Sequence, residues 1–207
     1  MTADEIESLF TRADGTFLFA RWARPIVPVV FGADDKTLSI FKGALEAVVS
    51  LAGHKMAETD PELGSNLMFF FFREWDELLD LDGLDRMLPE LDATVARLKA
   101  QDAHQYRLFR FEQSGAIKAG FVFLRVSGDL AKMAAEDLAL SEAVQVILLW
   151  GEGAFAARSP LARLPEGQVV LRPDVAGVIR AAYDPVMPVA EIDAAAVSLR
   201  LAARLGG

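Results

Sequence analysis

Cysteine is absent from this chain of 207 residues, and histidine is nearly absent. Without cysteine the protein cannot form disulfides, thiolate metal sites or a cysteine nucleophile. The two histidines are His54, which follows a predicted helix end, and His104, which precedes a predicted strand. The helix dipole favours a histidine at the first position, and a metal shared by His54 and His104 is the alternative that the sequence leaves open. Because no further ligand pattern accompanies them, we predict no metal and no other cofactor.

An excess of basic charge is also missing. The chain has 21 lysines and arginines against 30 aspartates and glutamates, which gives a formal net charge of −9. The basic residues are scattered, and Arg21 with Arg24 come nearest to a cluster. Binding to a phosphate backbone needs a concentrated basic surface. We therefore predict that nucleic acid is not a partner.

Long apolar runs are missing although the composition is apolar. Hydrophobic residues make up 53% of the chain and the mean hydropathy is +0.27. The longest runs, such as residues 67–72 and 144–150, fall below the roughly 18 residues that a membrane-spanning helix needs. The first residues are acidic and polar, unlike a secretory signal. We expect no membrane span and a cytoplasmic location.

Known ligand-binding loops are incomplete or absent. Residues 80–85 resemble part of a calcium loop, but the first and twelfth positions of an EF-hand loop would be Leu78 and Pro89, which cannot bind calcium. This segment is therefore predicted to form a turn and a helix cap. No phosphate-binding glycine pattern is present, and Ser141 has no nucleophile motif around it.

The spacing of apolar residues predicts alternating helices and strands. Helices are expected over residues 3–13, 35–52, 85–100, from after 128 to 150, 173–183 and 190–205. Strands are expected within residues 17–31, 66–72, 106–112 and 117–126. The last two should form a hairpin around Gly115, and the prolines of the first should place it at a sheet edge. The prolines between 160 and 165 predict an irregular connection.

This order of elements predicts an α+β fold. We expect a mixed β-sheet flanked by helices, which lie to one side of it, and a helical C-terminal part. We expect residues 1–207 to form a single domain. Its parts would be an N-terminal helix (1–16), a sheet-and-helix core (17–151) and the helical C-terminal part (152–207).

The segment Val144–Gly151 has the frame of a zinc-peptidase helix, H-E-x-x-H-x-x-G, without its chemistry. In that motif two histidines one helical turn apart bind zinc, and the glutamate between them polarises a water. Val144 and Leu148 occupy the histidine positions here, and Gln145 occupies the position of the base. These side chains neither bind zinc strongly nor take up a proton at neutral pH. The segment is therefore predicted to be a buried helix closed by Gly151, and not the centre of a zinc peptidase.

Several short motifs together resemble a zincin-like proteobacterial family of unknown function. These are Trp22 with Pro25 before a valine-rich strand, Asn66-Leu67 at the start of a second strand, Arg172-Pro173-Asp174-Val175, and the stretch 179–185 with its Tyr-Asp-Pro ending, followed by Pro188. In that family a helix of pattern E-E-L-x-Q-x-L-G replaces the zinc motif. The chain departs even from that pattern, since the polar positions become Val144, Gln145 and Leu148. The resemblance implies a zincin-like N-terminal part with a degenerate site.

This resemblance leads to one hypothesis of function, a non-catalytic scaffold that binds a protein or peptide. In peptidases of the zincin fold, the edge strand beside the zinc helix pairs with extended substrate, and strand addition is a general mode of peptide capture. We expect that edge strand within residues 117–126. Candidate residues of the binding cleft are Glu142, Gln145, Asp174 and Tyr183. We assign no catalytic residue and no metal ligand.

Two other hypotheses remain open. The first is a hydrolase in which Glu142, Asp174 and Asp184 converge in a cleft and divide acid and base roles. The second is a homo-oligomer in which the last helix buries its apolar residues between subunits. Those residues are Val197, Leu199, Leu201 and Leu205.

Overall fold

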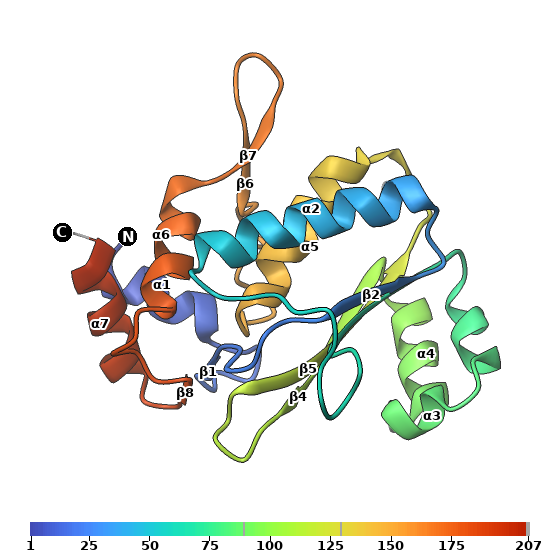
Figure 1. Ribbon diagram of the computed structural model, residues 1–207, viewed down its shortest axis with the longest axis horizontal. Coiled ribbons are helices and arrows are strands. Elements are labelled where there is room, and N and C mark those ends of the chain that lie inside the picture. Colours follow the sequence, from blue (N-terminus) through green and yellow to red (C-terminus); the bar gives the residue numbers. More distant parts are fainter. Residues whose placement is uncertain (89, 129, 206–207) are drawn as a thin grey trace.

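A mixed four-stranded β-sheet lies at the centre of the computed structural model, which describes residues 1–88, 90–128 and 130–205 (Figure 1). Its strands are β2 (Pro28–Phe31), β3 (Leu67–Phe72), β4 (Gln105–Phe111) and β5 (Ile117–Arg125). Their order across the sheet is β2-β3-β5-β4. Strands β2, β3 and β5 are parallel, whereas β4 runs antiparallel to β5. The α+β class with a mixed sheet is therefore confirmed.

The strand patterns agree with the positions of the strands in the sheet. Strand β3 has four consecutive phenylalanines and pairs on both sides, as its continuous apolar run predicts. Strand β2 begins with Pro28 and lies at an edge, as predicted from its proline. The hairpin between β4 and β5 is also confirmed, and its Gly115 has a positive φ of 81° that glycine adopts without strain.

Two long helices cover one face of the sheet. Helix α2 (Asp35–Leu51) begins at Asp34, whose side chain accepts a hydrogen bond from the backbone N–H of Thr37. Helix α5 (Ala135–Ile147) lies beside α2, after the short 3₁₀ helix η2 (Leu130–Lys132). Side chains of α2 and α5 join those of the sheet in the larger of two apolar cores, with Leu67, Phe69 and Val122 fully buried between them.

The other face of the sheet is covered as well, so the expectation of helices on one side only is wrong. Helix η1 (Trp75–Asp80), α3 (Leu84–Met87) and α4 (Leu91–Ala100) form a second apolar core with the opposite faces of β3 and β5. The alternation of side chains along these strands gives both faces apolar residues, and each face needs a cover. The helix predicted over 85–100 is divided into α3 and α4, and Pro89 between them lies outside the described residues. Gly83, with a φ of 78°, occupies the cap position of α3, and no side chain of a described residue caps this helix.

Both ends of the chain pack together beside α2 and the sheet. Helix α1 (Ala3–Phe10), helix α6 (Pro173–Ala182) and helix α7 (Ala194–Leu205) contribute to the larger core, and β1 (Phe19–Ala20) pairs with β8 (Ala190–Glu191). Val197 and Leu201 of α7 are buried within the chain itself. The oligomer interface predicted from this helix is therefore wrong for these two residues, and Leu199 is the member of the set that is exposed.

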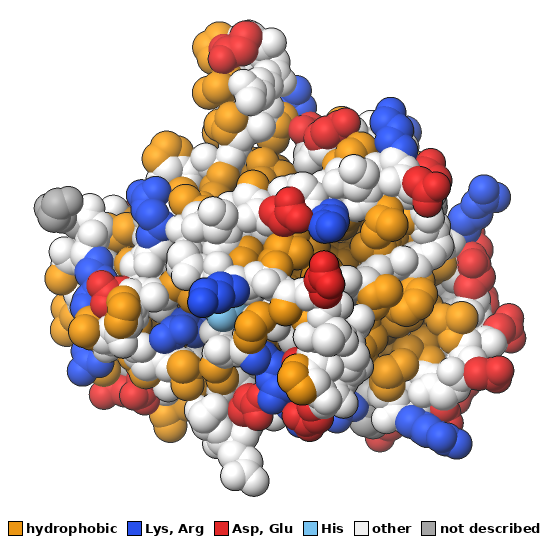
Figure 2. All heavy atoms as spheres, in the orientation of Figure 1, with side chains coloured by type: hydrophobic (Ala, Val, Ile, Leu, Met, Phe, Trp, Pro, Cys, Tyr) orange, Lys and Arg blue, Asp and Glu red, His pale blue; other side chains and the backbone are white. Residues whose placement is uncertain are grey.

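The segment predicted to be irregular after residue 160 forms a hairpin instead. Strands β6 (Leu161–Arg163) and β7 (Val169–Leu171) pair antiparallel and project from the body of the molecule (Figures 1 and 2). Its turn contains Gly167 with a φ of 94°. Among the described helices, none combines the length and apolar character required to cross a bilayer.

Candidate functional site: a groove along the edge strand β4

The edge strand beside α5 is β4, and the prediction that it lies within residues 117–126 is wrong. Strand β5 lies between β3 and β4, and almost all of its residues are buried. The physical reason is that β5 pairs on both sides and both faces of the sheet are covered, so its side chains must be apolar throughout. The presence of Gln105, Arg107 and Arg110 among the apolar residues of β4 is the sequence signal that could have identified the edge.

The hydrogen bonding of β5 determines which backbone groups of β4 are free. The N–H of Arg125 bonds to the carbonyl of His104, so these opposite residues form a hydrogen-bonded pair. The N–H of Gly120 bonds in the other direction, to Asn66 at the start of β3. Since hydrogen-bonded and non-bonded pairs alternate along an antiparallel ladder, Gln105, Arg107 and Phe109 direct their backbone N–H and C=O groups away from β5. No strand in the described part of the chain pairs with this outer edge.

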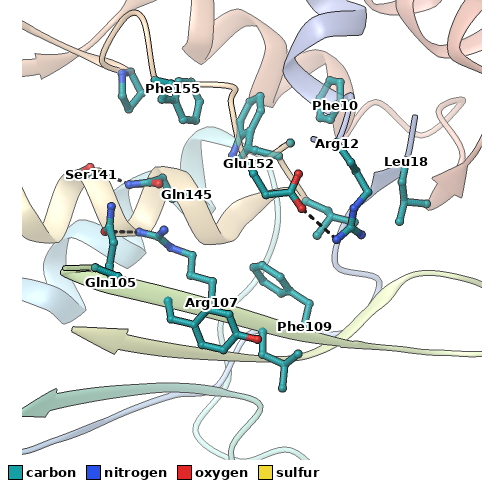
Figure 3. Close-up of a pocket in the computed structure, with 18 of the residues that line it drawn as sticks. Phe10, Arg12, Leu18, Gln105, Arg107, Phe109, Ser141, Gln145, Glu152 and Phe155 are labelled. Atoms are coloured by element: carbon teal, nitrogen blue, oxygen red, sulfur yellow. Dashed lines mark hydrogen bonds and ion pairs between the residues drawn. The ribbon is translucent and has the colours of Figure 1, made fainter. Parts of the chain in front are cut away.

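A groove of about 1200 Å³ follows this edge of β4. One wall is formed by α5 and by residues 149–160, which follow it, and Phe10 and Arg12 close one end. Figure 3 shows Arg107 and Phe109 rising from the strand toward Ser141 and Gln145 of α5. On the other face of the strand, Tyr106 and Leu108 meet the end of α4, which also lines the groove. The groove therefore reaches both faces of the edge strand.

A buried ion pair connects the floor of the groove to its wall. Nη2 of Arg107 lies 2.5 Å from Oε2 of Glu142 and 2.9 Å from Oε1 of Gln105. The Glu142 side chain is only 1% exposed and that of Arg107 is 17% exposed. Nε of Arg107 is buried without a hydrogen-bond partner among the described residues. The candidate residue Glu142 thus lies beneath the groove as the counter-ion of Arg107, a residue that we did not predict.

The predicted core role of the degenerate zinc helix is confirmed for two residues. Val144 and Leu148 are fully buried, whereas Gln145 lines the groove and donates from Nε2 to Oγ of Ser141 at 3.1 Å. The helix ends at Ile147, so the expectation that it continues to Trp150 and closes at Gly151 is wrong.

One nearby and two distant side chains replace the expected glycine cap. Trp150 Nε1 donates to the carbonyl of Val144, Trp22 Nε1 to that of Val146, and the Tyr183 hydroxyl to that of Ile147. These bonds satisfy three of the carbonyls that a helix C-terminus leaves free. Burial also raises the pKa of Tyr183, which keeps its hydroxyl a donor. The candidate residue Tyr183 therefore holds the end of α5 and is not part of the groove lining.

The three carboxylates of the hydrolase hypothesis belong to three separate ion pairs. Glu142 pairs with Arg107, Asp174 with Arg172 and Arg158, and Asp184 with Arg204. Burial would raise the pKa of Asp174, but hydrogen bonds from Arg172 and from the N–H of Val175 lower it below its usual range. Two carboxylates divide acid and base work only when they reach one substrate. This arrangement gives the hydrolase hypothesis no shared site.

The two histidines have different partners. Nε2 of His54 lies 2.8 Å from the carbonyl of Arg24 and its ring lies beside Tyr183, whereas Nδ1 of His104 lies 3.3 Å from Nη2 of Arg125. Burial, together with the charge of Arg21, lowers the pKa of His54 despite the hydrogen bond to Arg24. In the described ranges, no group of three or more histidine, aspartate or glutamate side chains is arranged to hold a metal ion.

Comparison of the chain with protein-family models, with curated proteins and with solved structures found no match.

Proposed function

We propose that this protein is a non-catalytic module that binds an extended segment of another protein or a peptide by strand addition to β4. The observation that carries the proposal is the outer edge of β4, which pairs with none of the described strands and faces a groove large enough for a peptide. Main-chain hydrogen bonds to such an edge supply affinity, and pockets for alternate side chains supply specificity. We propose, as part of the same function, that the protein is a zincin-like scaffold.

Three backbone positions would form the pairing. Gln105, Arg107 and Phe109 each direct an N–H and a C=O outward, so an added strand gains up to two bonds at each. The groove exposes both faces of the strand, which leaves room for successive side chains of the added peptide. Edge strands are usually protected against unwanted pairing by charge, and Arg107 and Arg110 provide charge here. The edge therefore binds a specific partner, and its charges oppose aggregation through edge-to-edge pairing.

Amide hydrogen exchange measured by NMR tests this proposal directly. The probe is an acetylated peptide of about seven residues, the length of β4, in which valine alternates with glutamine. We expect it to slow exchange at the amides of Gln105, Arg107 and Phe109. The amides of Tyr106 and Leu108 already face β5 and serve as internal controls.

A second peptide provides the matched control on the ligand side. Its sequence is the same, but the amides on its pairing edge are N-methylated, so they cannot donate hydrogen bonds. We expect this peptide to lose the protection at β4. Unchanged exchange at the three outward amides with the unmodified peptide at millimolar concentration would contradict strand addition.

A further inference from the structure

Four arginines line the groove along β4, although the protein as a whole is acidic. These are Arg12, Arg97, Arg107 and Arg158, and Glu152 is the one carboxylate among the described lining residues, while Glu142 and Asp174 pair with Arg107 and Arg158 from outside the lining. The whole chain has the opposite balance, with 30 acidic and 21 basic residues. Local charge of one sign in a cleft concentrates ligands of the opposite sign.

The arginines lie on both faces of the edge strand. Arg97 of α4 stacks over the ring of Tyr106, with its Cζ 5.7 Å from the ring centroid, and so lies on the α4 face. Arg107 extends over the opposite face, toward α5 (Figure 3). Glu142 neutralises Arg107, and Arg12 and Arg158 are the exposed arginines among the other lining residues. Side chains of an added strand alternate between the two faces, so a bound peptide would reach Arg97 with one set of side chains and the α5 side of the groove with the other.

Three of these arginines have guanidinium N–H groups that can donate to a further carboxylate. Arg97 makes no ion pair with any described residue. Arg12 pairs with Glu152 and Arg158 with Asp174, but both arginine side chains are well exposed, at 43% and 73%. Exposed pairs contribute little free energy, and a guanidinium offers five donors, so each group can accept a further carboxylate.

Aromatic side chains form the remaining wall. Trp150 stacks on Phe10 at a centroid distance of 5.2 Å and contacts Phe155 edge-on at 5.1 Å. All three residues line the groove. They offer an apolar surface to an aliphatic or aromatic side chain of the ligand.

We propose that the segment bound at β4 is acidic, with glutamate or aspartate side chains placed to meet the exposed guanidinium groups of Arg97, Arg12 and Arg158 and with interspersed apolar residues. This inference rests on the proposed strand addition and names the chemistry of its ligand. Carboxylates are the groups that arginine binds with two parallel hydrogen bonds. Electrostatic attraction also speeds the encounter of such a ligand with the groove.

Fluorescence anisotropy with two labelled peptides tests the inference. Both have about seven residues, the length of β4. In one, pairs of adjacent glutamates are separated by single valines, so that acidic side chains reach both faces of the added strand, and in the other glutamine replaces every glutamate. We expect the glutamate peptide to bind about tenfold more tightly at low salt, with a difference that shrinks as added salt screens the charges. Trp150 supplies a second readout, because it lines the groove, whereas Trp22 and Trp75 are buried and are not among the lining residues.

Two charge-reversal variants assign the effect to the groove. We expect Arg97→Glu to weaken the glutamate peptide about tenfold and to leave the glutamine peptide unchanged, since Arg97 acts through charge. Arg200→Glu makes the same change of net charge on the exposed face of α7, outside the groove, and should alter neither affinity. Equal affinity for both peptides would overturn the acidic specificity while strand addition remains supported. Binding of neither peptide would overturn both proposals.

Discussion

At the scale of single residues, Gly151 lies where two backbone segments approach each other so closely that there is no room for a side chain. Its N–H donates to the carbonyl of Leu9 at 2.8 Å, which ties the segment after α5 to α1. A Cβ atom at this position would lie 2.1 Å from the carbonyl oxygen of Thr11. Backbone atoms cannot move aside as a flexible side chain does, so the site excludes every other residue.

We predict that Gly151→Ala lowers the free energy of unfolding by about 3 kcal/mol, the upper range for overpacked positions. Urea unfolding followed by circular dichroism measures the change. Gly153→Ala is the matched control, because a Cβ at Gly153 meets nothing within 4 Å. If both variants lose the same stability, the contact with Thr11 is not the cause.

At the scale of elements, the Arg107–Glu142 pair joins the edge strand to the helix across the groove. Both side chains are largely removed from water, so neither charge can be compensated by solvent if the other is lost. The pair therefore fixes the spacing between β4 and α5, which sets the width of the groove. The side-chain caps from Trp22, Trp150 and Tyr183 fix the end of the same helix.

We predict that Glu142→Gln lowers the free energy of unfolding by about 3 kcal/mol, because it leaves the charge of Arg107 buried without its counter-ion. The double variant Arg107→Met with Glu142→Leu should recover most of this loss, since well-packed apolar residues often replace a buried pair at little cost. Thermal and urea unfolding of both variants provide the comparison. If the double variant is as unstable as Glu142→Gln, the loss of stability comes from changed packing and not from the unpaired charge of Arg107.

At the scale of the whole molecule, a polar cluster holds together segments that are far apart in the sequence. Arg24 binds both carboxylate oxygens of Asp60, at 3.1 and 3.2 Å, and also pairs with Glu62 and Glu112. Nδ2 of Asn66, at the start of β3, donates to Asp60 as well. The cluster thereby connects the entry to β2, the loop before β3 and the β4–β5 hairpin.

This cluster makes stability depend on pH in the acid range. Burial would raise the pKa of Asp60, but hydrogen bonds from the N–H groups of Leu63 and Glu62, from Arg24 and from Asn66 lower it to about 2. The unfolded chain has the ordinary value of 3.8, so it binds the proton more readily than the folded protein does. The contribution of Asp60 is complete above pH 3.8 and is lost as pH falls toward 2.

We predict that Asp60→Asn costs about 3 kcal/mol of unfolding free energy at pH 7, the loss expected when one member of a buried pair is removed. The difference from the natural protein should shrink between pH 4 and pH 2. Glu62→Gln, at an exposed position of the same cluster, should cost less than about 1 kcal/mol. A constant difference between Asp60→Asn and the natural protein down to pH 2 would contradict the lowered pKa.

The sequence by itself determined which local elements form. Periodic apolar residues and capping signals predicted α2, the buried strand β3, the β4–β5 hairpin and α6, because these depend on neighbours along the chain. The replacement of both zinc-binding histidines by Val144 and Leu148 likewise predicted a core helix, and both residues are buried. The α+β class followed from the order of these elements.

The tertiary structure decided which strand is the edge and which residues line the groove. Strand β5 is internal because it pairs with β3, from which it is separated by three helices and β4, and local patterns do not record such a long-range choice. The antiparallel pairing of β4 with β5 leaves the backbone groups of Gln105, Arg107 and Phe109 outward, and the packing of α5 beside β4 brings Glu142 to Arg107. The fold also places Glu142, Asp174 and Asp184, which the sequence alone allowed to converge, in three different ion pairs. Local sequence fixes conformation, whereas the groove is formed where distant segments pack together.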